Sequence, residues 1–314
     1  QNIVTSFNDI YFKDVYPMYG QIDISGSSEL RNKATQKDLL FQLNTLKEIL
    51  CNADASENNS TYKNVYNRIK ECIIEIKFHF NAQTERKTMH YIISEIHPIL
   101  NEIASNFAHL NSACNSYFKK INSKSQAFEN NQMQYSDAVK TINNSLLNRL
   151  DSMQVEAQKI IPHLFERFKT DGVDFNMFVG QSITKKKKFN LNLLNELRIW
   201  QLKAICQLER KFYQVQEKMD VNFSAASLIL AFNSMLTIQY RMDEKKFDIE
   251  GAYNASYEII KKRIDKSLIK NTNERITQNH KLVIVYSHLE DKNEDIKYLD
   301  LVIKEGYLKN DIQD

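Results

Sequence analysis

The stretch of chain between residues 19 and 32 carries the side chains whose types and spacing best fit a binding site. An extended apolar segment ends at a Gly-Ser-Ser turn, and a long helix with an acid in its first turn is predicted to begin there. Backbone N–H groups and the helix dipole favour an anion at a helix N-terminus. The sequence therefore offers a site for an anion or a phosphate group, whose candidate residues are Asp23, Ser27, Ser28 and Arg31. In the plainer interpretation, which we favour, Gly26 makes the turn and Ser27 or Ser28 only caps the helix.

Asp23-Ile24-Ser25-Gly26 also resembles the metal-binding Asp-Ile-x-Gly step of class III nucleotide cyclases, in which an aspartate on a strand holds magnesium. Such an enzyme needs a second aspartate on a neighbouring strand and a ferredoxin-like sheet around both. Because a helical bundle is expected directly after Asp23, the sequence argues against this class of enzyme. We expect no catalytic residues.

Other motifs of enzymes and metal sites are absent from the sequence. It contains no G-x-S-x-G, P-loop, G-x-G-x-x-G or H-E-x-x-H motif, so a nucleophilic serine or cysteine is unsupported. Several histidines fall in predicted helices, but di-iron bundles use Glu-x-x-His pairs and none occurs here. We therefore expect neither a metal nor another cofactor. The four cysteines, far apart and without a C-x-x-C pair, are expected to be reduced thiols in the core: Cys51, Cys72, Cys114 and Cys206.

Composition limits the classes of partner. The 314 residues include 42 basic and 39 acidic ones, so no strong overall field points to nucleic acid or to an anionic membrane. The run Lys185–Lys188 and the basic face near residues 261–270 lack interleaved aromatic side chains and are expected to be solvated. The longest apolar run, residues 225–232, is far shorter than the roughly 20 residues of a membrane-spanning helix. We expect a soluble, cytoplasmic protein that is a piece of a longer chain.

Helical periodicity dominates the first half of the chain. Apolar residues recur at helical spacing in five segments, and no glycine occurs between residues 28 and 170. Pro98 predicts a break or kink near His97, and Pro162 predicts a bend in the last helix, because proline removes a helix hydrogen bond. This pattern predicts an antiparallel bundle. Its helices are expected at residues 28–53, 62–81, 85–103, 107–121 and 127–168.

Strand signals dominate from residue 171 onward, where glycines return. Residues 193–208 fit both a strand and a helix, and we favour a strand at 200–208 passing into a helix. The fold class is thus mixed, an antiparallel helical bundle followed by a smaller α/β (α+β) domain, with domains at residues 1–170 and 171–314. The other predicted elements are strands at 173–179, 227–232, 236–242 and 281–286, a hairpin turn at 242–247, and helices at 254–269 and 295–304.

Four blocks of sequence resemble the C-terminal region of GAF-domain-containing signalling proteins of Bacteroidetes. They lie in the same order, at residues 15–24 with 26–32 and 36–39, at 162–173, at 241–248 and at 257–266, and the match spans nearly the whole chain. The resemblance implies an intracellular signalling protein in which a GAF sensor precedes this region. It implies no catalytic residues.

These observations predict a non-enzymatic signalling or regulatory interaction module. The expected partner is another protein or a second copy of the chain, and neither a membrane nor a nucleic acid is expected. The alternative is a domain that binds, or also transfers, a nucleotide or another phosphate-containing ligand at the Gly26-Ser27-Ser28 helix N-terminus. A structural scaffold for another protein is the third class.

Overall fold

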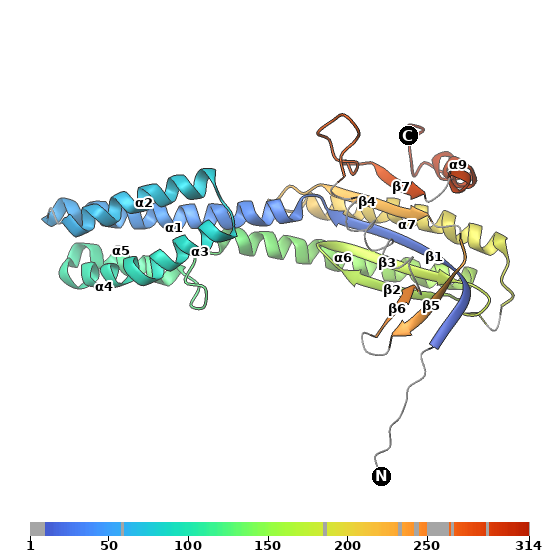
Figure 1. Cartoon of the computed structure of the whole chain (residues 1–314), viewed down its shortest axis with the longest axis horizontal. Coiled ribbons are helices and arrows are strands. Elements are labelled where there is room, and N and C mark those ends of the chain that lie inside the picture. The colour runs from blue at the N-terminus through green and yellow to red at the C-terminus, as the bar shows by residue number, and fades with distance from the viewer. Residues whose placement is uncertain are drawn as a thin grey trace, which may run out of the picture. The chain divides into compact units, whose positions relative to one another are not determined.

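The computed structural model describes residues 10–57, 60–184, 187–231, 234–241, 245–249, 264, 267–286 and 289–313 (Figure 1). The protein mixes helices with a seven-stranded sheet. Two compact units are present: one is formed by residues 26–138, and the other by residues 1–25 together with 139–314. The predicted boundary at residue 170 differs from this division. The reason is that residues near the N-terminus form a central strand of the sheet. They do so by pairing with strands far along the chain, and the local sequence does not indicate these pairings.

The main sheet has the strand order β2-β3-β1-β4-β7. Its central strand β1 pairs antiparallel with β3 on one side and with β4 on the other, and β4 pairs in parallel with β7. Helices separate β1 from β2 and β3 from β4 along the chain, so the first four strands follow the βαββαβ pattern of ferredoxin-like sheets. The strands are β1 (Ile10–Ile24), β2 (Leu164–Lys169), β3 (Gly172–Val179), β4 (Ala225–Ala231) and β7 (Leu282–Tyr286).

Strand β1 is long enough to join a second set of strands. Its first half pairs with β5 (Leu236–Arg241), which pairs in turn with β6 (Lys246–Ile249). The register of β1 shifts between Phe12 and Val15, where Asp14 has a positive φ of 55°. The predicted hairpin is therefore present in its described strands, while residues 242–244 of its turn lie outside the described part of the chain.

The two faces of the sheet have different coverings. A Cβ on Gly20 would meet the side chains of Phe175 and Ile205, so helix α7 (Leu191–Gln216) packs on that face of β1. Neighbouring residues of a strand point to opposite faces. The face of Tyr19 therefore carries another apolar cluster, which the β5–β6 hairpin shares: Val15, Tyr19, Phe178, Leu228, Leu230, Ile238 and Ile249.

Helix α7 corrects the prediction of a strand at residues 200–208. It is continuous from residue 191 to 216, and the side chain of Asn190 accepts a hydrogen bond from the N–H of Leu193 at its start. Buried residues recur every three or four positions, at Leu194, Leu197 and Gln201 and beyond. This helical period extends over the whole segment, whereas the strand-like alternation covers only a few residues.

Helix α6 (Asn130–Ile160) is shorter than predicted. The prediction that it runs to residue 168 was wrong, because residues 164–169 form strand β2. Proline disfavours the helical conformation of the residue before it, and Pro162 therefore ends the helix instead of bending it.

The unit of residues 26–138 contains helices α1 to α5. They share one apolar core, in which α1 packs on α2 and α5, and α4 packs on α5. Near His97, where a kink or break is predicted, the structure has a π-helical turn, η1 (Ile92–Ile96), and α4 follows it with Pro98 in its first turn. An antiparallel bundle stays a prediction. The helices are α1 (Ser27–Glu57), α2 (Ser60–Phe78), α3 (Ala82–Tyr91), α4 (His97–Asn106) and α5 (Ala108–Lys120).

The C-terminal helices and one cysteine differ from the predictions. Most of the predicted helix 254–269 lies outside the described residues, and its end differs from the prediction because Leu268 forms an isolated β-bridge with Arg275. The closing helix α9 (Leu289–Lys304) begins earlier than expected. Three cysteines are buried and free, whereas Cys51 is exposed on α1, so its placement in the core was wrong. In the part of the chain that the structure describes, no helix is long and apolar enough to cross a membrane.

Candidate functional site

The four predicted ligand residues are divided between the two compact units. Asp23 lies near the end of β1, in the unit that contains the sheet, whereas Ser27, Ser28 and Arg31 lie in the first turn of α1. Ser28 and Arg31 are exposed, and the carbonyl of Ser27 accepts a hydrogen bond from the hydroxyl of Tyr135 at 3.1 Å. The four residues thus belong to different compact units, and a site formed by all four stays a prediction.

Gly26 makes the turn before α1. Its φ of 66° lies in the left-handed region, and its carbonyl accepts hydrogen bonds from the N–H groups of Glu29 and Leu30 at 2.9 and 3.0 Å. Ser27 and Ser28 are already inside the helix, so the prediction that one of them caps it is corrected: Gly26 holds the position before the first helical residue.

The carboxylate of Asp23 is held by neutral hydrogen-bond donors. Gln21 Nε2 donates to Asp23 Oδ2 at 3.0 Å, and Thr170 Oγ1 donates to Asp23 Oδ1 at 3.2 Å. The hydroxyl of Tyr19 donates in turn to Gln21 Oε1 at 3.0 Å. These contacts orient the carboxylate of Asp23.

The turn between β2 and β3 lies directly against the end of β1. Gly172 is in register with Asp23, and the N–H of Ile24 donates to the carbonyl of Asp171 at 3.3 Å. A Cβ on Gly172 would lie 2.0 Å from the carbonyl oxygen of Ile22, 2.6 Å from Asp23 Cα and 2.7 Å from Asp23 Oδ1. Only glycine allows this approach, and the approach brings a second aspartate, Asp171, beside the end of the strand that carries Asp23.

This arrangement meets part of the sequence-based argument against a cation at Asp23. That argument required a second aspartate on a neighbouring strand and a ferredoxin-like sheet around both. The βαββαβ sheet is present, and Asp171 lies in the turn directly before β3 instead of on a strand. The helices that follow Asp23 along the chain are an insertion between the first and second strands of that sheet. The sequence reasoning missed Thr170, Asp171 and Gly172. The sequence shows only a change in composition at these residues, and that change marks a turn without indicating what the turn contacts.

The donor atoms suit a hard divalent cation. Carboxylate, hydroxyl and carbonyl oxygens are the ligands that Mg²⁺ and Mn²⁺ prefer. Among the described residues, no group of three or more His, Cys, Asp or Glu side chains could hold a metal ion. A cation at Asp23 and Asp171 would therefore complete its coordination with water and with the oxygens of a ligand, as Mg²⁺ commonly does with phosphates.

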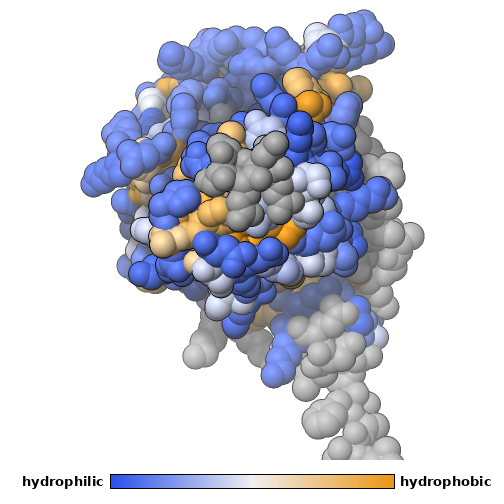
Figure 2. Space-filling model, turned by 90° about the vertical axis from the view of Figure 1, so that its left-hand side faces the viewer, coloured by the Kyte–Doolittle hydropathy of each residue, from blue (hydrophilic) through white to orange (hydrophobic). Residues whose placement is uncertain are grey.

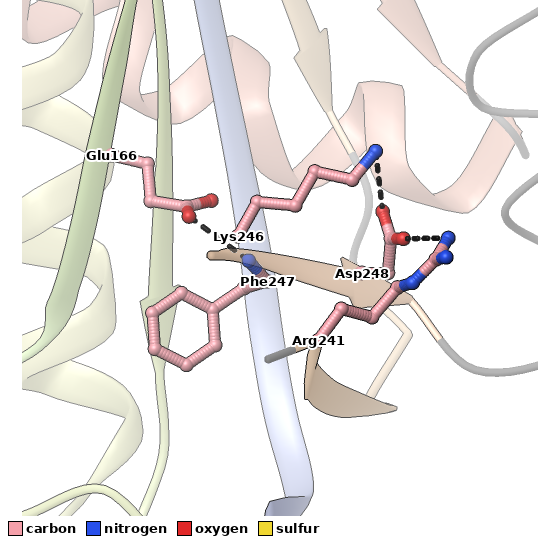
Figure 3. A network of polar contacts seen from close by, with 5 residues as sticks. All are labelled: Glu166, Arg241, Lys246, Phe247 and Asp248. Atoms are coloured by element: carbon pink, nitrogen blue, oxygen red, sulfur yellow. Dashed lines mark hydrogen bonds and ion pairs between the residues drawn. The ribbon is translucent and has the colours of Figure 1, made fainter. Parts of the chain in front are cut away.

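A second cluster of charged residues attaches the β5–β6 hairpin to the edge of the main sheet (Figure 3). Glu166 of β2 accepts a hydrogen bond from the N–H of Phe247 in β6 at 2.9 Å. Asp248 pairs with Arg241 at 3.3 Å and with Lys246 at 3.6 Å. Burial raises the pKa of Glu166, and the nearby charge of Asp248 adds to the rise, although the hydrogen bond from Phe247 opposes it. These contacts fix the hairpin and need no ligand to explain them.

A third cluster joins Ser227, Glu209 and His280, three residue types that hydrolases use. The hydroxyl of Ser227 donates to Glu209 Oε2 at 2.6 Å, and His280 Nδ1 lies 4.0 Å from Glu209 Oε1. Burial raises the pKa of Glu209. Because Ser227 is fully buried and bonded to the carboxylate instead of the imidazole, the cluster lacks the serine–histidine contact of a nucleophile.

The basic stretches singled out in the sequence contribute little to a site. Lys185 and Lys186 lie outside the described residues, and Lys187 Nζ donates to the backbone carbonyl of Ile160. Of the basic face near residues 261–270, only Lys270 falls in the described part of the chain, where it is exposed.

Comparisons with family models, curated proteins and solved structures gave no match to this chain. The likeness to GAF-containing signalling proteins therefore stays a proposal.

Proposed function

We propose that the unit containing the sheet binds a nucleotide or another phosphate-containing ligand through a divalent cation, Mg²⁺ or Mn²⁺. Asp23 and Asp171 would hold the cation, and Gln21 and Thr170 would orient the carboxylate of Asp23. The observation that carries the proposal is the close approach of the β2–β3 turn to the end of β1, which Gly172 permits. Two carboxylates completed by phosphate oxygens form a common way for proteins to hold Mg²⁺ on a nucleotide.

The chemistry that fits this arrangement best is binding, or transfer, of a phosphoryl or nucleotidyl group. A cation at the two aspartates would neutralise phosphate charge. The residues of the chain would supply the two carboxylates and hold them in position. A fold pattern alone does not establish a reaction, so the proposal rests on the aspartates and the turn and not on the ferredoxin-like strand order.

The direct test is ligand binding with matched variants. A panel of nucleotides and cyclic dinucleotides, each with Mg²⁺ or Mn²⁺, is screened by thermal shift, and hits are measured by calorimetry. Asp23→Asn and Asp171→Asn should each weaken cation-dependent binding at least about tenfold, because each removes a charged ligand. Asp220→Asn, at an exposed position, is the control. No stabilisation of folded protein by any member of the panel, or equal binding by all variants, would contradict the proposal.

Product analysis separates a binding domain from a transferase. Release of pyrophosphate or formation of a cyclic nucleotide from nucleoside triphosphate, dependent on Mn²⁺ and lost in Asp23→Asn, would assign transfer. Tight binding without turnover would assign a ligand-sensing role, in line with the expected cytoplasmic signalling function.

A second candidate function, a protein-interaction module, is favoured by the surface of the helical unit. Large apolar side chains are exposed there, and Figure 2 shows hydrophobic residues grouped among hydrophilic ones on one face of the molecule. The exposed side chains of this unit are Phe41, Ile74, Phe78, Ile93 and Met133. We propose that they contact another protein or a second copy of the chain. A strict monomer at high concentration in size-exclusion chromatography with light scattering would contradict the homodimer.

A further inference from the structure

We infer that Asn143 of helix α6 is a positioning residue for the candidate cation site. Its side chain is fully buried, and its Nδ2 donates a hydrogen bond to the backbone carbonyl of Thr170 at 2.9 Å. Thr170 opens the turn that carries Asp171, and its hydroxyl donates to the carboxylate of Asp23. Asn143 therefore acts on the site through Thr170.

The turn has its own internal hydrogen bonds, which Asn143 complements. Thr170 Oγ1 accepts from the N–H of Gly172 at 3.2 Å, and the N–H of Thr170 donates to the carbonyl of Gly172 at 3.1 Å. These bonds set the shape of the turn. The bond from Asn143 instead fixes the turn relative to a helix, so it determines where the turn lies and not how it is folded.

An amide at this position is costly unless it has such a role. The neighbouring buried positions of α6 are apolar, at Ile142, Leu146 and Leu150. A buried polar group without a full set of partners destabilises a fold by about 1–3 kcal/mol. Within the described structure, the Oδ1 atom of Asn143 is buried and has no hydrogen-bond partner. A leucine at this position would avoid the cost of the unpaired oxygen. Asparagine differs from leucine by supplying a hydrogen-bond donor to the carbonyl of Thr170.

The consequence for ligand binding rests on the proposed function, but the positioning does not. If Asn143 fixes the turn, removing its amide lets the turn move away from β1. The N–H of Ile24, which donates to the carbonyl of Asp171, reports that movement. The N–H of Gly172, which donates to Thr170 Oγ1 within the turn, should keep its hydrogen bond and is the internal control.

The test compares Asn143→Leu and Asn143→Asp with the wild type and with Asn144→Leu, whose asparagine is the exposed neighbour on the same helix. Leucine has no donor, and aspartate keeps the shape but turns an acceptor toward the carbonyl. Hydrogen exchange of the Ile24 amide should be about tenfold faster in both Asn143 variants, as expected for one lost hydrogen bond, whereas exchange of the Gly172 amide should stay unchanged. Cation-dependent nucleotide affinity should fall about tenfold, the typical effect of removing a supporting hydrogen bond around a metal site. Asn144→Leu should change neither quantity.

Each outcome decides the inference. Unchanged exchange at the Ile24 amide in a folded Asn143 variant overturns it, as does an equal acceleration in Asn144→Leu. If Asn143→Leu does not fold, the same two measurements on Asn143→Asp decide it. Faster exchange in a protein whose wild type binds none of the nucleotides would establish the positioning role and reject the proposed function.

Discussion

Two histidines are buried in the fold and have neutral hydrogen-bond partners. His97 Nε2 is 2.9 Å from the hydroxyl of Tyr117 in the helical core. His163 Nδ1 donates to the carbonyl of Ile161 at 2.8 Å, and its Nε2 lies 2.6 Å from Gln154 Nε2 and accepts from it. Burial lowers the pKa of both imidazoles. Protonation would place a charge in the interior and remove the acceptor that Gln154 uses.

The lowered pKa values predict a loss of stability in mild acid. An unfolded histidine has a pKa of about 6.5, above that of the buried one, so the unfolded state binds more protons as the pH falls below that value. Stability is therefore fully present above about pH 6.5 and decreases toward the folded pKa. The urea midpoint of wild type should fall between about pH 7.5 and about pH 5.5, and His163→Gln should fall less. The exposed His90→Gln should behave as wild type. Parallel curves for wild type and His163→Gln would contradict the prediction.

At the candidate site, the sequence identified one aspartate and not the other. Asp23 is found because it precedes a turn and a helix start within a few residues. Asp171 lies beside the end of β1 only through the pairing of β1 with β3, in which Gly172 lies opposite Asp23. Local sequence holds no information about that register, so Asp171 could not be predicted from spacing alone.

Among the elements, helix α6 begins on a carboxylate that comes from another helix. Asp38 of α1 is 1% exposed and accepts from the N–H groups of Asn131 and Gln132, both at 2.9 Å, and from Asn131 Nδ2 at 2.7 Å. The carboxylate thus satisfies two N–H groups in the first turn of α6 and interacts favourably with the helix dipole.

Asp38→Ala should destabilise the helical unit by about 1–2 kcal/mol, the usual cost of losing an N-cap, because two backbone N–H groups lose their acceptor. Lys37→Ala, at the exposed neighbouring position, should change stability by less than about 0.5 kcal/mol. Urea unfolding followed by far-UV circular dichroism measures both. Equal midpoints for the two variants would show that Asp38 does not cap α6 in solution.

Two glycines at element ends have different requirements, and matched substitutions separate them. Gly26 needs a left-handed backbone and has open space, with the nearest atom 3.8 Å from an added Cβ. Gly26→Ala should cost about 1 kcal/mol and Gly26→Asn less, because asparagine adopts this conformation more readily. Gly172 has no room for any Cβ. Both Gly172→Ala and Gly172→Asn should therefore destabilise the protein by more than about 3 kcal/mol or displace the turn. Thermal unfolding of the four variants measures these effects. A Gly172→Ala variant as stable as wild type would contradict the packing of the turn on β1.

The elements also show where sequence patterns suffice. Because proline acts locally, a kink or break near Pro98 and a bend at Pro162 were predicted. The structure has a π-helical turn before Pro98, and α6 ends before Pro162 instead of bending. The strand β2 after Pro162 was missed, since residues 164–169 also satisfy a helical stripe and become a strand by pairing with β3. In α7 the two periods compete, and burial against the sheet selects the helical one.

At the scale of the whole molecule, the order of the units along the chain explains the predicted domain boundary. Strand β1 comes first, the helical unit follows, and the remaining strands come last. The sequence pattern changes from helical to strand-like near residue 170, and the predicted boundary lies at that change. The contribution of residues 10–24 to the sheet depends on pairing with strands more than a hundred residues away, which composition does not encode.

Each unit has an apolar core of its own, so the same substitution, leucine to alanine, can be made in each core. Leu46 is fully buried in the core of the helical unit, and Leu228 is 2% exposed in the core beneath the β5–β6 hairpin. Replacing a buried leucine by alanine costs about 2–5 kcal/mol through lost burial and the cavity left behind. In differential scanning calorimetry, Leu46→Ala should lower one transition and Leu228→Ala a different one, because neither side chain belongs to the other core. The exposed Leu191→Ala should move neither transition appreciably. A single transition shifted equally by Leu46→Ala and Leu228→Ala would show that the chain unfolds as one cooperative unit.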